Sequence, residues 1–306
     1  MKNKQLYTNA KFVAIIAAIC CFFWGSSYPA IKIGLVLFDI SPDDIPSKFV
    51  FAGYRFAIAG IALLLVARAY GIKVFSLSLQ SFRQLSILGV IQTTIHYAIF
   101  YIGVSNTSGT KGSIMNATTA FFGVVLAHYV YKNDKLSRGK VLGSMIGFLG
   151  VVIVNFSADL LNFTFRFTGE GFVIVAAFIF SAVGLYAKKL TKTLDVVLIT
   201  SYSLLIGGIA LTVIGIAFGG KVNHFTWESS SLLMFLAVSS SASFYLWNWL
   251  LKYNKVGRVS VYNFLVPVFG VTLSSIFLGE AILEIKNLLA LVLVSLGIWL
   301  VNKEDT

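Results

Sequence analysis

Charged residues are scarce in this sequence of 306 residues. Asp, Glu, Lys and Arg together make up only 12%, which is about half the share of an average soluble domain. Apolar residues, counted without glycine, make up 58%. A soluble fold of this length cannot hide so much apolar surface from water. The composition therefore excludes one or two ordinary soluble domains and predicts a protein that lies largely in lipid.

Cysteines and catalytic motifs are scarce as well. Cys20 and Cys21 are the two cysteines, and they are adjacent within one apolar run, so they cannot build a disulfide framework or a zinc site. The apolar runs contain no HExxH, no paired aspartates and no GxSG-like nucleophile elbow, and there is no glycine-rich phosphate loop. We therefore expect neither an intramembrane enzyme nor an ATP-driven pump, and no cofactor. A channel or a purely structural protein remains as an alternative.

Acidic residues are the scarcer charged type. The chain has 12 Asp and Glu against 24 Lys and Arg, which gives a formal net charge of +12. The basic residues lie mostly between apolar runs, so we expect them to set membrane topology and do not expect nucleic acid as a partner. No acidic residue lies near the middle of a run, because Glu170, Asp195, Glu280 and Glu284 all lie at run edges.

Ten apolar runs are long enough to predict helices that cross a bilayer, which takes about 20 residues. The expected fold is an all-α membrane protein with ten transmembrane helices. The runs are Phe12–Leu37, Ser47–Tyr70, Phe82–Val104, Lys111–Tyr131, Gly139–Phe156, Gly169–Leu190, Asp195–Gly219, Ser229–Tyr253, Arg258–Gly279 and Leu283–Asn302.

The charges between the runs predict the orientation, because Lys and Arg accumulate on the cytoplasmic side. With both termini in the cytoplasm, every basic cluster falls inside, and the outer connections carry Asp39, Asp43, Asp44 and Asp159 with few basic residues. The inside clusters are Lys2/Lys4/Lys11, Arg68/Lys73/Arg83, Lys132/Lys135/Arg138/Lys140, Lys188/Lys189/Lys192 and Lys252/Lys255/Arg258.

The two halves of the chain resemble each other. Shifting the chain by 147 residues aligns Ser113 with Ser260 and Asn116 with Asn263, and aligns the sequence Phe-Gly-Val at 122–124 with the same sequence at 269–271. We therefore predict two repeats, residues 1–156 and 157–306. Since five spans is an odd number, the second repeat enters the membrane from the opposite side, as in many secondary transporters. Coincidence between apolar stretches is the alternative, although polar positions coincide too.

Several short motifs carry a family resemblance. Trp24-Gly25-Ser26-Ser27 lies in the first run with Lys32 beyond it, Arg55-Phe56 lies in the second run, and Pro267 precedes Phe277-Leu278-Gly279-Glu280 in the ninth. With these motifs the chain resembles the EamA family of the drug/metabolite transporter superfamily over essentially its whole length, and within it the YddG-like exporters of amino acids and metabolites. The resemblance implies a ten-helix carrier in which spans 5 and 10 pack outside a central cavity.

The first repeat departs from the family pattern at two positions. Ala120 stands where the family often has proline, and Asn133 stands where it often has glutamate. These departures argue against a mechanism with two symmetric proline hinges. Pro29 and Pro267 each remove a backbone hydrogen bond within a run, and they are the predicted hinges.

Polar residues within the runs are the candidates for a substrate site. Arg55 is expected to be buried and to bind backbone carbonyls, whereas Lys32 and Lys111 can also extend to the lipid headgroups. His96 is either a hydrogen-bonded packing residue or a proton carrier, and Asn116 and Asn263 are either glue between helices or cavity-lining amides. Adding aromatic and polar neighbours on the same faces, the substrate-binding candidates are Trp24, Tyr28, Lys32, Arg55, Gln92, His96, Asn116, Thr119, Tyr245, Asn248 and Asn263.

Spacing separates packing residues from lining residues at two places. Gly143 and Gly147 form a GxxxG pair in the fifth run, which predicts close helix packing and no substrate contact. Trp247 and Trp249 point to different sides of the eighth span, so we expect at most one of them to line a cavity.

These features predict a secondary transporter of the cell membrane that exports small metabolites by alternating access. Basic and amide groups favour a carboxylate-bearing substrate such as an amino acid or small organic acid, with a partly apolar side chain. The alternatives are neutral or cationic drugs, and phosphorylated or nucleotide-linked metabolites. The expected partners are the substrate and membrane lipid, and the sequence leaves monomer and homodimer open. The lack of carboxylates within the runs favours facilitated diffusion, with His96 as the candidate for proton coupling.

Overall fold

The computed structural model describes residues 2–156, 165–278 and 285–303, and this part of the chain consists of helices and their connections, without strands. The bounds in the first half are α1 Lys2–Thr8, α2 Ala10–Leu37, α3 Ile45–Ala69, α4 Leu79–Gly89, the π-helix η1 Val90–Ile95, α5 His96–Ser105, α6 Gly109–Val130 and α7 Arg138–Val154. In the second half they are the π-helix η3 Phe167–Gly171, α8 Phe172–Leu190, α9 Val196–Ala217, α10 Trp227–Tyr253, α11 Val256–Ser260, the 3₁₀-helix η4 Val261–Phe264, α12 Leu265–Leu278 and α13 Ile285–Lys303.

Nine helical segments of the described residues are long and apolar enough to cross a membrane. The fifth expected run, Gly139–Phe156, forms the shorter helix α7 of 17 residues, which spans about 25 Å at 1.5 Å per residue, less than the hydrocarbon core of about 30 Å. The chain is thus a multi-pass, all-helical membrane protein. Gly279 and Glu280 of the ninth-run motif, and most of the connection before η3, lie outside the described residues.

Six of the described α-helices begin at a residue whose side chain accepts a backbone N–H of the first turn. Asn9 caps α2, Ser108 caps α6, and Thr226 forms a reciprocal capping box with Ser229 at the start of α10. Such residues bind N–H groups that have no partner within the helix. At the other end, Gly71 and Gly219 follow α3 and α9 with φ of +78° and +86°, a backbone conformation that glycine adopts without strain.

Three of the expected spans are not regular α-helices throughout, and one of them, Gly169–Leu190, begins within the π-helix η3. The third run contains η1, so that Gln92 lies in a π-helical turn. The ninth run is divided into α11, the 3₁₀-helix η4 and α12, so Asn263 and Pro267 do not share one continuous helix face, as their spacing predicted. Pro267 is the third residue of α12, and it lies where the 3₁₀-helix η4 passes directly into α12.

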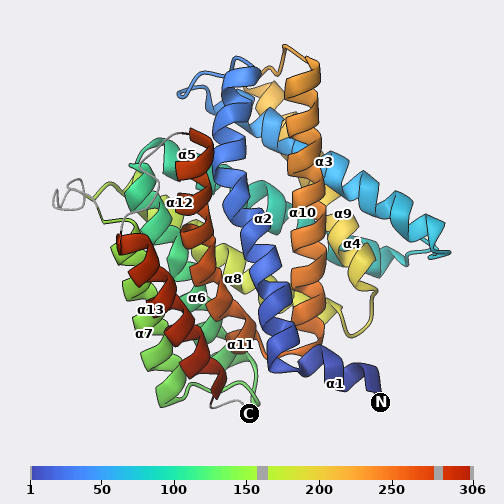
Figure 1. The fold of residues 1–306 in the computed structure, drawn as a ribbon. Coiled ribbons are helices and arrows are strands. Elements are labelled where there is room, and N and C mark those ends of the chain that lie inside the picture. The colour runs from blue at the N-terminus through green and yellow to red at the C-terminus, as the bar shows by residue number, and fades with distance from the viewer. Residues whose placement is uncertain (1, 157–164, 279–284, 304–306) are drawn as a thin grey trace.

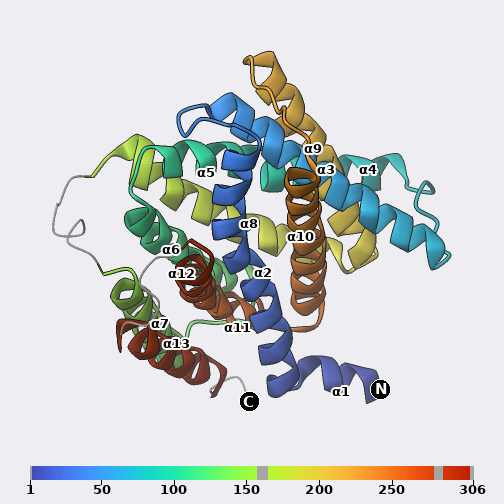
Figure 2. The ribbon, with the colours of Figure 1, turned by 45° about the horizontal axis from the view of Figure 1, so that its top comes forward.

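Glycines allow two pairs of helices to approach closely. On α3 and α9, a Cβ atom at Gly53 would lie 2.8 Å from the carbonyl oxygen of Gly208. On α7 and α13, a Cβ at Gly143 would lie 2.5 Å from the carbonyl oxygen of Gly297, which confirms the expected close packing at the GxxxG pair. Figures 1 and 2 both show α7 and α13 side by side at one edge of the molecule, away from α3 and α9.

The helix bundle is packed differently at its two ends. Helix α2 runs along the middle of the molecule in Figure 1 and connects these ends. Near the start of α2, apolar side chains of α2, α6, α10, α11 and α12 form the largest core cluster, with Ala17, Cys20, Leu250 and Val259 fully enclosed. We call this the α10–α11 end. The opposite end, where α5 connects to α6, contains the cavity described below, and we call it the α5–α6 end.

Candidate substrate cavity

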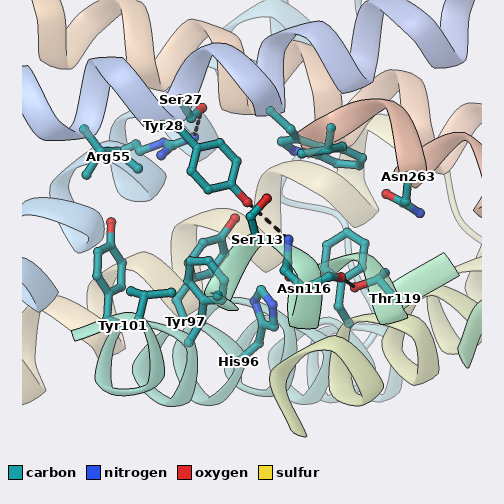
Figure 3. A pocket seen from close by; sticks show the side chains of 17 residues that line it. Ser27, Tyr28, Arg55, His96, Tyr97, Tyr101, Ser113, Asn116, Thr119 and Asn263 are labelled. Atoms are coloured by element: carbon teal, nitrogen blue, oxygen red, sulfur yellow. Dashed lines mark hydrogen bonds between the residues drawn. The ribbon is translucent and has the colours of Figure 1, made fainter. Parts of the chain in front are cut away.

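A cavity of about 250 Å³ lies between the two halves of the chain. Its walls come from α2, α3, α5, α6, α8, η4 and α12, and none of its described lining residues lies on α7 or α13. It reaches the α5–α6 end, because Val104 and Gly112 on either side of that connection line it. Figure 3 shows Arg55, Tyr97 and Tyr101 at one end of the cavity and Thr119 and Asn263 at the other.

Arg55 is the charged side chain of the cavity wall, and no acidic side chain of the described residues lines it. Its guanidinium donates through Nε to the hydroxyl of Ser240 at 2.6 Å and through NH2 to the hydroxyl of Ser27 at 2.9 Å. Arg55 is therefore buried, as predicted, but it binds serine hydroxyls and not backbone carbonyls. Both partners are neutral, so they leave the positive charge uncompensated.

Aromatic rings enclose the rest of the cavity. Tyr97, Phe100 and Tyr101 line the cavity from α5. Trp24 of α2 packs edge-on against Phe180 of α8, with 5.7 Å between the ring centroids. The wall is therefore mostly apolar, with a few polar atoms at defined positions, as is typical of small-molecule sites.

Tyr28 links two walls of the cavity. Its hydroxyl accepts a hydrogen bond from Nδ2 of Asn116 at 3.3 Å, and Thr119 in turn donates to the carbonyl oxygen of Asn116 at 2.7 Å. Figure 3 shows the Tyr28 ring pointing across the cavity towards Ser113 and Asn116. Asn263, which a shift of 147 residues aligns with Asn116, lines the same cavity, so both amides are cavity residues.

His96, which the sequence predicts to be either a hydrogen-bonded packing residue or a proton carrier, also lines the cavity. Its side chain is 6% exposed, and its Nδ1 atom has no hydrogen-bond partner. The ring is surrounded by other rings, with centroid distances of 4.6 Å to Tyr97 and 5.4 Å to Phe180. These contacts fit the packing role, and the role of proton carrier stays a prediction.

A second cavity of only about 20 Å³, which we call the chamber, lies towards the α10–α11 end. Thr119, Phe180 and Asn263 line both spaces, whereas Leu251 and Val256 line only the chamber. The predicted residues Gln92 and Asn248 belong to the chamber and not to the large cavity. Trp247 lines it too, whereas its neighbour Trp249 does not, in agreement with the expectation that only one of them borders a cavity.

Two predicted site residues, Lys32 and Tyr245, line neither space. At 100° per residue, Lys32 lies about 80° around α2 from Trp24, whereas Ile31 lies within about 20° and lines the cavity in its place. Tyr245 lies about 100° around α10 from Phe244, which lines the chamber. Lys32 is exposed and Tyr245 half-buried. Lys111, the weaker candidate, does not line the cavity either.

Sequence reasoning missed several lining residues. Tyr97, Tyr101 and Val104 recur at the i, i+4 and i+7 spacing of one helix face, a signal that could have been used. Phe180 has no comparable signal, because it lies in a run that is apolar on all sides. Among the described residues, no group of three His, Cys, Asp or Glu side chains is arranged to hold a metal ion.

The α10–α11 end is closed by polar contacts as well as by the core. Asp134, in the connection after α6, is 2% exposed and accepts from Lys140 Nζ at 2.7 Å and from the Gly257 N–H at 2.8 Å. Lys188 of α8 donates through Nζ to the carbonyl oxygens of Leu251 and Asn254 at the end of α10. Of these contacts, the hydrogen bond from the Gly257 N–H to Asp134 joins the first half of the chain to the second.

Known proteins resemble this chain over nearly its full length. The model of the EamA-like transporter family matches residues 11–156 and again 167–303. The uncharacterized transporter YoaV of Bacillus subtilis (strain 168) is 24% identical, over 90% of this chain and 92% of that protein. The WAT1-related protein At3g02690, chloroplastic, of Arabidopsis thaliana is 22% identical, over 92% of this chain and 67% of that protein. A crystal structure that covers 97% of this chain, and is itself covered completely, has the same fold, with a TM-score of 0.79 at 14% identity.

Proposed function

Because the chain belongs to the EamA-like transporter family, we propose that it is a secondary transporter of the cell membrane that exports small carboxylates with an apolar side chain, either amino acids or organic acids. One observation carries the choice of substrate. The cavity wall holds the buried guanidinium of Arg55, and no carboxylate of the described residues compensates its charge.

Arg55 has bonding capacity left for a carboxylate. A guanidinium carries five N–H donors, and hydrogen bonds to Ser27 and Ser240 use two of them. A buried charge without an opposite charge is costly, and a planar carboxylate matches the guanidinium with two parallel hydrogen bonds. A carboxylate bound at this position would therefore neutralise the charge of Arg55, and the two hydrogen bonds would orient the substrate.

The remaining walls fit the other parts of such a substrate. The rings of Tyr97, Phe100 and Phe180 supply apolar surface for a side chain, and the amides of Asn116 and Asn263 supply polar groups away from Arg55. The volume of about 250 Å³ admits a molecule of amino-acid size. Nucleotide-linked metabolites are too large for this space, and a cationic drug would meet Arg55 without an acidic counter-charge.

Alternating access follows from two inverted repeats in this proposal. The helix pairs support it. If each helix of the first half is replaced by its equivalent in the second, and the reverse, the contact of α2 with α12 becomes the contact of α8 with α6, and both contacts are present. The same exchange turns the contact of α3 with α9, and that of α7 with α13, into itself. The two matches of one family model also support it. The cavity reaches one end while core and polar contacts close the other, which suits one of the two access states.

The basic connections favour an outward-facing assignment for this state. Lys132, Lys135, Lys192 and Lys255 lie in connections at the α10–α11 end, and Lys189 lies in the last turn of α8 at the same end. By the positive-inside rule this end faces the cytoplasm, so the cavity opens to the exterior. Figure 1 shows α1 and the end of α13 at one end of the bundle, which suits two cytoplasmic termini.

Uptake into proteoliposomes tests the proposal. L-leucine and 4-methyl-2-oxopentanoate share an apolar side chain and a carboxylate, whereas L-leucinamide keeps the side chain and amine but lacks the carboxylate. We expect saturable flux of the first two compounds and little of the third. Transport of tetraethylammonium or of a nucleotide-linked sugar, without transport of either carboxylate, would overturn the proposed substrate class.

A further inference from the structure

The chamber is polar although it lies inside an apolar bundle. Four residues with polar side chains line the chamber but not the large cavity: Gln92, Ser181, Asn248 and Ser260. Buried polar groups are normally hydrogen-bonded. Ser181 donates to the carbonyl oxygen of Thr119 at 2.8 Å, and Asn248 donates through Nδ2 to the hydroxyl of Thr200 at 3.0 Å.

Gln92 departs from that rule. Its side chain is 4% exposed, and its Nε2 atom has no hydrogen-bond partner. An amide nitrogen is a donor, so the group it lacks is an acceptor such as a carboxylate or carbonyl oxygen. Leaving such a donor unpaired is costly, and an occupant of the chamber would relieve that cost.

The backbone at Gln92 is unusual too. Gln92 lies in the π-helix η1, and His96, the residue that follows η1, begins α5. Single π-helical turns within α-helices are frequent at functional sites. Gln92 and His96 each carry an unpartnered nitrogen, but Gln92 lines only the chamber and His96 lines only the large cavity.

Phe180 borders both spaces, as Thr119 and Asn263 do, and it is the aromatic residue of the three. Its ring lies 5.4 Å from the ring of His96, 5.7 Å from Trp24 and 6.3 Å from Phe244. A volume of about 20 Å³ holds one small polar group and not a whole metabolite. The chamber thus suits the leading end of a substrate whose remainder lies beyond Phe180.

We propose that the chamber is a second substrate site on the route to the α10–α11 end, in which Gln92 Nε2 binds the carboxylate that Arg55 binds in the large cavity, and that Phe180 must turn aside for the exchange. This inference rests on the proposed function, because the carboxylate is the group that both sites share. It assigns to Gln92 a role in moving the substrate towards the α10–α11 end, whereas Arg55 binds the substrate in the large cavity.

The test separates binding from transport. Gln92→Leu keeps the approximate size of the side chain and removes the amide. L-leucine binding to purified protein, measured by tryptophan fluorescence, should stay within about twofold, while L-leucine flux in proteoliposomes should fall at least about tenfold, the value of one hydrogen bond to a charged group. Ser144→Ala is the matched control, because Ser144 is also buried with an unpartnered hydroxyl but lies on α7, away from both spaces.

Unchanged flux in Gln92→Leu would overturn the inference, and so would an equal loss of binding and flux. If wild-type protein neither binds nor transports L-leucine or 4-methyl-2-oxopentanoate, the proposed function fails instead.

A second measurement needs no substrate. In a Ser181→Cys variant with Cys20 and Cys21 replaced by alanine, 2-aminoethyl methanethiosulfonate should label the introduced thiol slowly, and adding Phe180→Ala should accelerate labelling. Equal labelling rates would show that Phe180 is not the barrier.

Discussion

The carboxylate of Asp134 accepts a hydrogen bond from the backbone N–H of Gly257 at 2.8 Å and so joins the connection after α6 to the start of α11. Its other oxygen accepts from Lys140 Nζ at 2.7 Å. The first contact bridges the two halves of the chain at the end that the large cavity does not reach. In an alternating-access cycle, this contact has to break when that end opens.

Asp134→Asn should lower the stability of the protein. The asparagine oxygen can still accept from Gly257, but Lys140 loses its charged partner while it remains buried. Removing one member of a buried ion pair typically costs about 3–5 kcal/mol. Unfolding of the detergent-purified protein measures the change, with Asp43→Asn at an exposed position as the control. A variant as stable as wild type would show that the pair contributes little to the stability of the protein.

The orientation in the membrane gives a second prediction. Asp43 and Lys192 are exposed and lie in connections at opposite ends of the bundle. A membrane-impermeant maleimide applied to intact cells should label Asp43→Cys, and should label Lys192→Cys only after the membrane is made permeable. Cys20 and Cys21 are fully buried, so they should give little background. The opposite labelling pattern would reverse the topology and place the cavity towards the cytoplasm.

Energy coupling gives a third prediction. No carboxylate of the described residues lines the cavity, and His96 is the one histidine in its wall. We expect facilitated diffusion, with L-leucine flux independent of an imposed pH gradient. His96→Gln should lower flux by about two- to tenfold at most, because it alters no more than a neutral hydrogen bond. Uphill transport driven by the gradient and abolished in His96→Gln would instead identify His96 as the proton carrier.

The helical architecture was predictable because a bilayer leaves few alternatives. Runs such as Ser47–Tyr70 must satisfy their backbone groups internally, so composition and length predict the helix directly. The π-turn at Gln92 and the 3₁₀ segment at Asn263 were not predictable, because neither contains the proline or glycine that marks an interrupted helix. Both contact segments far apart in the chain, η1 against α9 and η4 against α6.

The candidate site was predictable where polarity marks a residue. Arg55, His96 and Asn116 stand out within apolar runs, and all three line the cavity. Lys32 stands out equally but lies on another face of α2. Phe180 could not be distinguished from other phenylalanines, and the pairing of Asp134 with Lys140 could not be separated from an ordinary basic loop, because both depend on tertiary contacts.

Discrimination at Arg55 between a carboxylate and its amide tests the account most directly. The measurement is the ratio of L-leucine flux to L-leucinamide flux in proteoliposomes with wild type, Arg55→Lys and Arg55→Gln, each checked for folding by size-exclusion chromatography. Hydrogen bonds to charged groups are worth about 1.5–3 kcal/mol, so the ratio should fall about ten- to hundredfold in Arg55→Gln. Arg55→Lys should keep part of it, because lysine retains the charge but not the planar fork. A ratio in Arg55→Gln equal to that of wild type would contradict the assignment of Arg55 as the carboxylate-binding residue.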